Sequence, residues 1–344
     1  MESFALTKQD TSVMKGIAIC AMLLHHLYGY PPNGVLPYDG ILQWLGVLGK
    51  VCVALFLFCS GYGLSANYKP QSVLGDLKFI AKRLVKFYAN YWVIFLIFVP
   101  LSLFVFHQPA DAYANRIWLN PIALCKSIFG FDNTYNVTWW FNSVILKFYI
   151  LFPILYRLIR LKPWVAIIVG MILMRLENHM PFDTVWQFPF LMGIVWQLYE
   201  DKLPKLSAWL NEHKIVFAIS SIFLFLLMVS VRMYLIIPHW TGVRMDAFVT
   251  CAVALVMLSI LQYSSWITIA FSFLGKHSMN IYWIHTFFNA YWFTSWLHTG
   301  GFMRSGGSFL VLLSICLCIS IVFEYMKKVC GLNNLVNVIS TKLK

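Results

Sequence analysis

Charged residues are scarce in this chain, and acidic ones are the scarcest. Only 11% of the 344 residues are charged, and only 13 are aspartate or glutamate. A soluble domain usually has about 25% charged residues. Because 60% of the residues are hydrophobic, the composition excludes an ordinary soluble globular protein. We predict an all-α polytopic membrane protein.

Several other features are absent. The eight cysteines include no C-x-x-C pair, and no histidine and cysteine spacing is typical of a metal site. We therefore predict no disulfide framework and no bound metal. No small-residue cleavage site follows the first apolar run, so we expect this helix to stay in the mature protein. No long polar segment or low-complexity tail is present either. We predict a single integral-membrane domain over residues 1–344, without an appended soluble domain.

Basic residues exceed acidic ones, giving a formal net charge of +13. They gather in alternate loops, at 8–15, 69–86, 157–162, 202–214, 276 and 327–344. Positive charge in alternate loops marks the cytoplasmic side, so we expect no nucleic-acid partner. Apolar segments of roughly 20 residues can span a bilayer. The candidates are 13–30, 42–64, 87–106, 139–160, 164–178, 185–200, 215–237, 246–264, 278–297 and 308–326, with 265–275 as an interfacial or re-entrant piece. This predicts about ten spans with both termini in the cytoplasm.

The first apolar helix carries ionisable residues in "MKGIAICAMLLHH". Lys15 and His26 are eleven positions apart, which is close to three helical turns, so they share a face roughly 16 Å apart. His25 is rotated by about 100° from that face. Ionisable side chains within a membrane usually face a cavity or the protein interior and mark a functional path. The spacing fits the two ends of one elongated ligand, although Lys15 is also explained as a positive-inside anchor.

Five segments together resemble a known family. They are "MKGIAICAMLLHH", "LFLFCSGYGLSANY", "FIAKRLVKFYANYW", "WWFNSVILKFYILFPIL" and "FLGKHSMNIYWIHTFF". Their order resembles the family 3 membrane acyltransferases, bacterial integral-membrane enzymes that transfer acyl groups to surface sugars and glycans. That family has a basic residue, usually arginine, then ten residues, then histidine. Lys15 stands at the arginine position. Because lysine lacks the planar guanidinium of arginine, a bidentate contact with phosphate is less expected here.

The resemblance implies an acyl-coenzyme A co-substrate, most often acetyl-CoA, a sugar or glycan hydroxyl as acceptor, and no permanently bound cofactor. It also implies a multi-pass protein of the bacterial cytoplasmic membrane. His26 would be the general base, or would carry the acyl group as a relay, and His25 would support it. The donor would be held by Lys15 and by the basic loop from Lys78 to Lys86, with Lys82, Arg83 and Lys86 as its main contacts.

Other side chains are candidates for stabilising the oxyanion or binding the acceptor. They are Tyr62, Asn142, Tyr149 and His285, with His25 as a further oxyanion donor. Charged groups near the predicted outer ends of the middle helices, Glu177 and Arg244 among them, suggest where a glycan binds. Each has a structural alternative: Ser60-Gly61-Tyr62 is also explained by close helix packing, and Glu177 by an ion pair with Arg175. The glycosylation pattern at Asn136 carries no weight in a bacterial protein.

Two other functions share some of these features. A transporter or flippase for a lipid-linked glycan would also have many spans and intramembrane charges, but it usually shows a repeat between its halves, which we do not find. A glycan polymerase or ligase would have a larger outer loop than the one around 107–138. The identity of the acceptor and the choice between direct transfer and relay are left open by the sequence.

Overall fold

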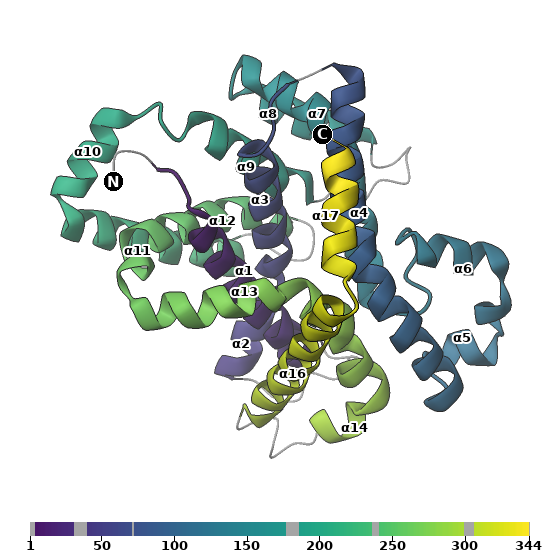
Figure 1. The fold of residues 1–344 in the computed structure, drawn as a ribbon. Helices are drawn as coiled ribbons and strands as arrows, with labels where there is room; N and C mark the ends of the chain where they lie inside the picture. The colour runs from purple at the N-terminus through teal and green to yellow at the C-terminus, as the bar shows by residue number, and fades with distance from the viewer. Residues whose placement is uncertain are drawn as a thin grey trace. The chain divides into compact units, whose positions relative to one another are not determined.

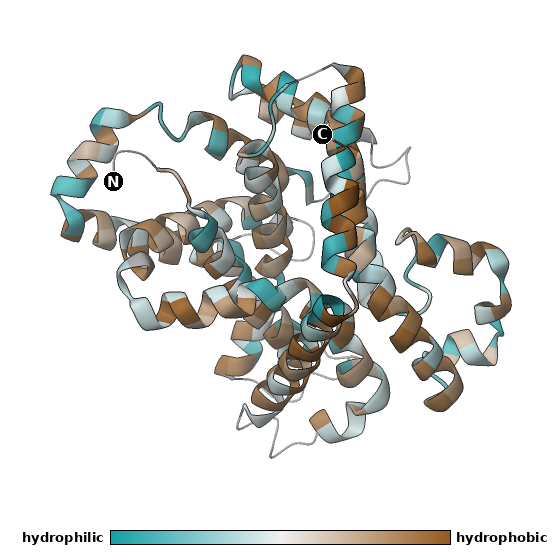
Figure 2. Ribbon diagram, viewed as in Figure 1, coloured by the Kyte–Doolittle hydropathy of each residue, from teal (hydrophilic) through white to brown (hydrophobic). Residues whose placement is uncertain are grey.

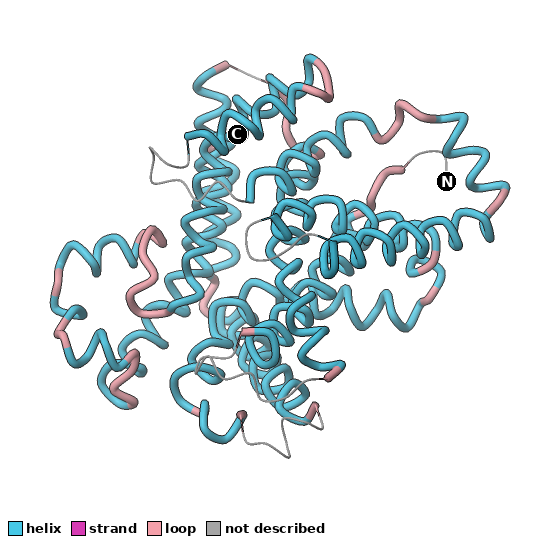
Figure 3. The backbone as a smooth tube through the Cα atoms, turned by 180° about the vertical axis from the view of Figure 1, so that it is seen from behind, coloured by secondary structure: helices cyan, strands magenta, loops and turns pink. Residues whose placement is uncertain are grey.

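The computed structural model describes residues 4–30, 40–70, 72–176, 186–235, 241–298 and 306–343, without the side chains of 174–176, 235, 241–244 and 262. Regular structure in these residues is entirely helical, with no strand among them (Figure 3). Together with the apolar composition, this confirms the prediction of an all-α polytopic membrane protein.

The helices follow one another with short connections (Figure 1). The α-helices are α1 (Lys8–Leu24), α2 (Ile41–Leu48), α3 (Cys52–Ser65), α4 (Val73–Pro100), α5 (Ala110–Ala114), α6 (Pro121–Ile128), α7 (Trp140–Leu161), α8 (Val165–Leu176), α9 (Gln187–Tyr199), α10 (Pro204–Glu212), α11 (Lys214–Ser230), α12 (Thr241–Ser259), α13 (Ser265–Thr286), α14 (Thr294–Leu297), α16 (Gly307–Val329) and α17 (Leu332–Lys342). Single π-helical turns extend four of these helices: η1 (His25–Gly29), η3 (Leu101–Val105), η7 (Val231–Leu235) and η9 (Phe287–Trp292). Short 3₁₀ turns are η2 (Gly49–Val51), η4 (Ile117–Leu119), η5 (Val137–Trp139) and η8 (Leu261–Tyr263).

Four of the described helical segments are long and apolar enough to cross a membrane. They are Ile41–Ser65, Val73–Val105, Lys214–Tyr234 and Gly307–Val329, and Met245–Ser259 is a shorter apolar helix. Brown, the hydrophobic colour, covers most of α16 in Figure 2. The stretch 265–275 is the first half of the continuous helix α13. The count of about ten spans and the cytoplasmic termini stay predictions.

The chain divides into two compact units. The first comprises Met1–Met22, Leu48–Pro70 and Leu151–Lys276, and the second comprises Leu23–Val47, Gln71–Ile150 and His277–Lys344. Helices α1, α7 and α13 each contribute residues to both. Whether residues 1–344 form a single domain stays a prediction.

The first unit is packed through glycines. A Cβ atom at Gly61 would lie 2.2 Å from the carbonyl oxygen of Phe190, and one at Gly193 would lie 2.2 Å from that of Phe58. The backbones of α3 and α9 are therefore in direct contact, as small residues allow between membrane helices. Gly275 of α13 approaches the Ser12 carbonyl of α1 in the same way. The Ser60-Gly61-Tyr62 segment thus contributes to close helix packing.

The second unit is packed through aromatic side chains. Trp139 and Trp283 are almost fully buried, and both contact the ring of Tyr91 on α4. Each indole finds a hydrogen-bond acceptor: Trp139 Nε1 donates to the Trp283 carbonyl at 3.1 Å, and Trp283 Nε1 donates to Asn142 Oδ1 at 2.9 Å. This pattern lets large rings fill the interior without stranding a buried N–H group. The cluster joins α4, α7 and α13.

The segment 107–138 returns along α4. Three side chains of α4, Tyr88, Tyr91 and Trp92, donate hydrogen bonds to the carbonyls of residues 129, 127 and 128, at the end of α6. The last carbonyls of a helix have no partner within it, and here α4 supplies the donors. At its other end, α6 begins with Pro121 and is capped by Asn120. This arrangement places η5 and the start of α7 beside the aromatic cluster.

Candidate functional site

The two adjacent histidines of the first apolar run lie where α1 becomes the π-helical turn η1. Such turns are rare and frequently occur at functional sites, because the extra residue redirects the side chains that follow. His25 and His26 are both partly exposed, but their contacts differ. His25 Nδ1 lies 2.9 Å from the carbonyl oxygen of Gly46 on α2. His25 is therefore tied to the backbone of a neighbouring helix.

This tie depends on two glycines. A Cβ atom at Gly29 would lie 2.3 Å from the Gly46 carbonyl carbon and oxygen, and one at Gly46 would lie 2.4 Å from the Gly29 nitrogen. Real Cβ atoms do not approach backbone this closely, so η1 and α2 pack backbone against backbone only because both residues are glycine. The close approach brings the Gly46 carbonyl within reach of His25.

The His26 ring is held by ring contacts rather than by hydrogen bonds. Its centroid lies 5.0 Å from that of His285 on α13, with the planes tilted by 38°, and 5.2 Å from that of His25. None of the described residues forms a hydrogen bond with its ring nitrogens. A histidine that is positioned by packing and keeps its nitrogens unoccupied can bond a substrate directly.

His285 is fully buried and is bonded at both ring nitrogens. Nδ1 lies 2.7 Å from the Tyr282 carbonyl oxygen. A carbonyl only accepts, so Nδ1 carries the proton. Nε2 faces the hydroxyl of Thr286 at 3.3 Å. The Thr286 hydroxyl lies 2.7 Å from that of Thr138, which in turn lies 2.8 Å from Asn136 Oδ1. A line of polar atoms therefore runs from the buried ring to the start of α7.

The backbone at His26 has its own support. Asn289 Nδ2, from the π-helical turn η9, donates to the His26 carbonyl at 3.2 Å, and Asn289 Oδ1 lies 2.9 Å from His298 Nε2. Burial lowers the pKa of His298, which follows the predicted span 278–297, so the ring is neutral at pH 7. Its Nε2 carries the proton that the Asn289 oxygen accepts. These two residues hold the turn that presents His26.

The basic residues of α4 lie in the same unit as the histidines. Lys78, Lys82 and Lys86 are spaced by four and share one face of the helix, and Arg83 lies beside it with its guanidinium over the ring of Phe79. Lys86 is exposed, and Lys82 and Arg83 are half-buried. The basic segment ends where the aromatic cluster begins, since the next residue, Phe87, contacts Trp283, two positions before His285.

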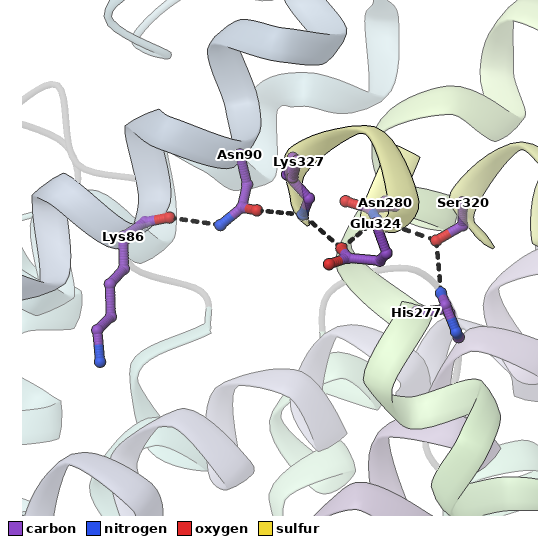
Figure 4. Close-up of polar contacts among 7 residues, drawn as sticks. All are labelled: Lys86, Asn90, His277, Asn280, Ser320, Glu324 and Lys327. Atoms are coloured by element: carbon purple, nitrogen blue, oxygen red, sulfur yellow. Dashed lines mark hydrogen bonds and ion pairs between the residues drawn. The ribbon is translucent and has the colours of Figure 1, made fainter. Parts of the chain in front are cut away.

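A polar network fixes α4 against α13 and α16 (Figure 4). Lys327 is buried and its ammonium group contacts both Glu324 and Asn90 of α4. The network continues through Asn280 and Ser320 to His277. Asn90 Nδ2 donates to the Lys86 carbonyl at 2.6 Å, while the Lys86 side chain extends away from the network. The Lys327 ammonium is thus occupied, and the Lys86 ammonium stays available to a ligand.

The structure separates the remaining predicted residues. Tyr149 lies near enough to Arg83 for electrostatic interaction, so it groups with the basic segment. Asn142 is fully buried against Trp283, which is rotated by about 200° around α13 from His285. Lys15 and Tyr62 belong to the first unit, where the Tyr62 hydroxyl donates to Glu200 Oε2 at 2.8 Å and also bonds the backbone of Leu6.

Glu177 lies outside the described residues, as do Asp183 and His239, two further ionisable groups near the predicted outer ends of the middle helices, and the side chains of Arg175 and Arg244 are not described. Their predicted roles at an acceptor site stay predictions. Among the described residues no three histidine, cysteine or acidic side chains gather as metal ligands. All eight cysteines are free.

Sequence reasoning missed Asn136, Thr138, Thr286 and Asn289. Asn136 and Thr138 form the glycosylation pattern to which no weight was given, yet both are buried and belong to the polar line at His285. A signal was present: the pattern directly precedes the two tryptophans of "WWFN", and Thr286 directly follows His285. Asn289 had no such signal, because its role depends on the π-helical turn.

A comparison with known protein families gives one match. A family model described as an acyltransferase domain matches residues 10–324. No curated protein and no solved structure matches the chain. The matched range contains both histidines of η1, the basic segment of α4 and His285.

Proposed function

Because the chain belongs to the family 3 acyltransferases, we propose that it transfers an acyl group, with acetyl the leading candidate, from acyl-coenzyme A to a hydroxyl of a cell-surface or lipid-linked sugar. Membership in the family agrees with the resemblance of the sequence motifs and supports acyl transfer in general. The donor, the acceptor and the residue roles are the proposal. The bilayer is the bacterial cytoplasmic membrane in this proposal.

The observation that carries the proposal is the difference between the two adjacent histidines. His25 is bonded to the Gly46 carbonyl, whereas the His26 ring nitrogens have no hydrogen-bond partner among the described residues. His26 also packs on the ring of His285, which fixes its orientation without using its nitrogens. An imidazole in this state is suited to accept a proton from a sugar hydroxyl. A positioned general base typically accelerates such a step by about 10²–10⁴-fold.

In this reaction His26 takes up one proton and later returns it. His26 accepts the proton of the acceptor hydroxyl as the oxygen attacks the thioester carbonyl, forming the new ester C–O bond. The tetrahedral intermediate collapses, the C–S bond breaks, and the proton passes from His26 to the thiolate of coenzyme A. In the relay alternative, His26 attacks the thioester first and the sugar hydroxyl then attacks the acyl-imidazole. Direct transfer is the simpler path.

The donor is held from the basic segment of α4 in this proposal. Coenzyme A carries several phosphate charges, which charge-assisted hydrogen bonds from lysine and arginine stabilise. Lys86 is exposed and Arg83 is held over Phe79, so both present cations at one end of α4. Lys82 lies on the same face, and Lys15 of α1 is the fourth proposed contact.

Isotope transfer tests the proposal. Membranes that contain the wild type, His26→Ala or His213→Ala receive radiolabelled acetyl-CoA, and label is counted in the polysaccharide and lipid-linked fractions. His213 is an exposed histidine of the first unit and serves as the matched control. We expect label with the wild type and His213→Ala, and a loss of at least about 100-fold with His26→Ala at equal protein abundance.

Two results would contradict it. Full activity of His26→Ala would remove that residue from the chemistry. No label with any variant, in cells with an intact glycan pathway, would argue against acetyl-CoA as donor. Omitting the acceptor separates the two mechanisms: label that stays on the wild-type protein and is released by hydroxylamine indicates the relay, and its absence indicates direct transfer.

A further inference from the structure

Each hydrogen bond of the polar line that starts at His285 can be assigned a donor and an acceptor. Its members are the His285 ring, the hydroxyls of Thr286 and Thr138, and Asn136 Oδ1. All four residues are at least nine-tenths buried, with exposed fractions of 0%, 2%, 6% and 0%. Water therefore does not compete readily for these bonds, and each donor must find its acceptor within the line.

The two ends of the line have fixed roles. His285 Nδ1 is committed as a donor to the Tyr282 carbonyl, which leaves Nε2 as the variable atom. At the other end, Asn136 Oδ1 only accepts, and it already receives the Thr138 backbone N–H at 3.0 Å. The amide assignment is supported by Asn136 Nδ2, which faces the Trp283 carbonyl at 3.4 Å.

Between these ends, two hydroxyls with one proton each can point either way. When His285 is neutral, the Thr138 hydroxyl turns its proton from Asn136 Oδ1 to Thr286, Thr286 donates to His285 Nε2, and Asn136 Oδ1 keeps only the Thr138 backbone N–H. When Nε2 carries a proton, it donates to Thr286, Thr286 donates to Thr138, and Thr138 donates to Asn136 Oδ1. Both arrangements satisfy His285 and both hydroxyls, and only O–H bonds rotate. The line therefore accommodates either protonation state of His285 without moving a heavy atom.

Thr138 is held in place for this role. The hydroxyl of Tyr282 donates to the Thr138 carbonyl at 2.7 Å, so Tyr282 and Thr286 of one helix both bond the same residue of η5. The neighbouring Trp139 bonds the Trp283 carbonyl. Three contacts thus fix η5 against α13, and the Thr138 hydroxyl has little freedom besides rotation about its own C–O bond.

We propose that Thr286 and Thr138 are positioning residues for the histidine pair: the Thr286 hydroxyl, itself bonded to the Thr138 hydroxyl, binds His285 Nε2 in either protonation state and thereby holds the ring that packs on His26. This inference rests on the proposed function, because it assigns His26 as the residue that touches the acceptor. Thr286 and Thr138 act only through His285. Without the hydroxyls, Nε2 has no partner in this line, and the ring that orients His26 loses its attachment at that nitrogen.

Kinetics test the role. Thr286→Val and Thr138→Val keep the shape of threonine but remove the hydroxyl, whereas Thr286→Ser and Thr138→Ser keep it. We expect each valine variant to lower kcat roughly tenfold, the scale of one hydrogen bond, with both KM values within twofold of the wild type. The serine variants should recover most of the rate. Because the two hydroxyls act in one line, the double valine variant should lose little more than either single one.

Thr268→Val is the matched control, since Thr268 is a buried threonine of α13 in the first unit whose hydroxyl bonds the Leu261 carbonyl. It should leave kcat unchanged. Wild-type rates in Thr286→Val and Thr138→Val would overturn the proposal, and so would a loss that serine does not recover. If one valine variant fails to fold, the other position still decides.

A readout without activity separates this inference from the proposed function. In protein labelled with ¹⁵N-histidine, the His285 resonances are those absent from His285→Gln. We expect the neutral ring to be protonated at Nδ1, and the unprotonated Nε2 to shift when Thr286 is changed to valine but not when it is changed to serine. An unshifted Nε2, or a ring protonated at Nε2 alone, would overturn the inference even if acyl transfer occurs. If the expected shifts are seen but no acyl transfer occurs, the inference about the two threonines stands and the proposed function is wrong.

Discussion

The two units of this protein both carry ionisable groups within apolar helical segments, and the contacts of these groups differ. In the first unit, Arg232 of η7 forms an ion pair with Asp246 of α12, with side-chain exposures of 6% and 0%. In the second unit, the His26 ring has contacts with other rings, but its nitrogens have no hydrogen-bond partner among the described residues. The two charges are paired through Asp246 Oδ1, and this pairing makes a structural role sufficient. The ring nitrogens of the histidine have no hydrogen-bond partner among the described residues, and in the proposed function they bond the substrate.

The ion pair gives the largest expected effect on stability. Asp246→Ala leaves the Arg232 guanidinium buried without its partner, and breaking such a pair costs about 3–5 kcal/mol. We expect a large fall in Tm and in the amount of folded protein, with the rate per folded molecule within twofold of the wild type. Replacing both partners, as Arg232→Met with Asp246→Leu, should recover most of the stability.

Thermal unfolding in detergent and transfer rates normalised to folded protein make this measurement. His26→Ala should behave in the opposite way, with an unchanged Tm and a loss of transfer of at least about 100-fold. An Asp246→Ala variant that is stable but has a raised acceptor KM would place the ion pair in acceptor binding and would remove the contrast between the two units.

The two adjacent histidines sharpen the comparison at a smaller scale. His25→Ala removes the bond to the Gly46 carbonyl but leaves His26 on the same turn. We expect roughly a tenfold loss of kcat, the scale of one positioning hydrogen bond, against the loss of at least about 100-fold for His26→Ala. Single-turnover assays on purified protein would measure both. Equal losses would mean that His25 takes part in the chemistry itself.

The smallest expected effects belong to the cations that would hold the donor. Neutralising Lys86 as glutamine should raise the KM for acyl-coenzyme A by about three- to fivefold, because contacts from exposed charges are individually weak, and Lys15→Gln should raise it more because Lys15 is half-buried. Arg83→Gln should cost more, since its guanidinium is half-buried. Lys328→Gln is the control, an exposed lysine at the end of α16. If donor KM values stay unchanged, these residues serve only to orient the protein in the membrane.

Much of the fold class could be predicted from composition alone, because an apolar chain with few charges has to satisfy its backbone within helices. The candidate site was partly predictable, because Lys15 and His26 are close in sequence and helical periodicity relates their positions. The preference for His26 over His25 was not settled by periodicity. It depends on a carbonyl 21 residues away and on the Gly29 and Gly46 contact, neither of which a helical pattern contains.

The π-helical turns could not be predicted from the sequence either. They add one residue to a helical turn in response to tertiary contacts, and the sequences of η1 and η9 carry no distinguishing composition. Thr138 and Thr286 are 148 positions apart, and only the folded chain brings their hydroxyls together. Side chains that act through such distant pairs are the part of a site that a single sequence conceals.

That distant pair has a consequence for sequence comparison. When two buried hydroxyls bond each other, replacing one of them alone removes a hydrogen-bond partner from the other, and this cost disappears when both are replaced together. Among homologous chains, the positions equivalent to 138 and 286 should therefore vary as a unit, with serine or threonine at both or at neither. A statistical coupling of this kind would locate the end of α13 and the start of α7 in relatives too divergent for their histidine motifs to be recognised.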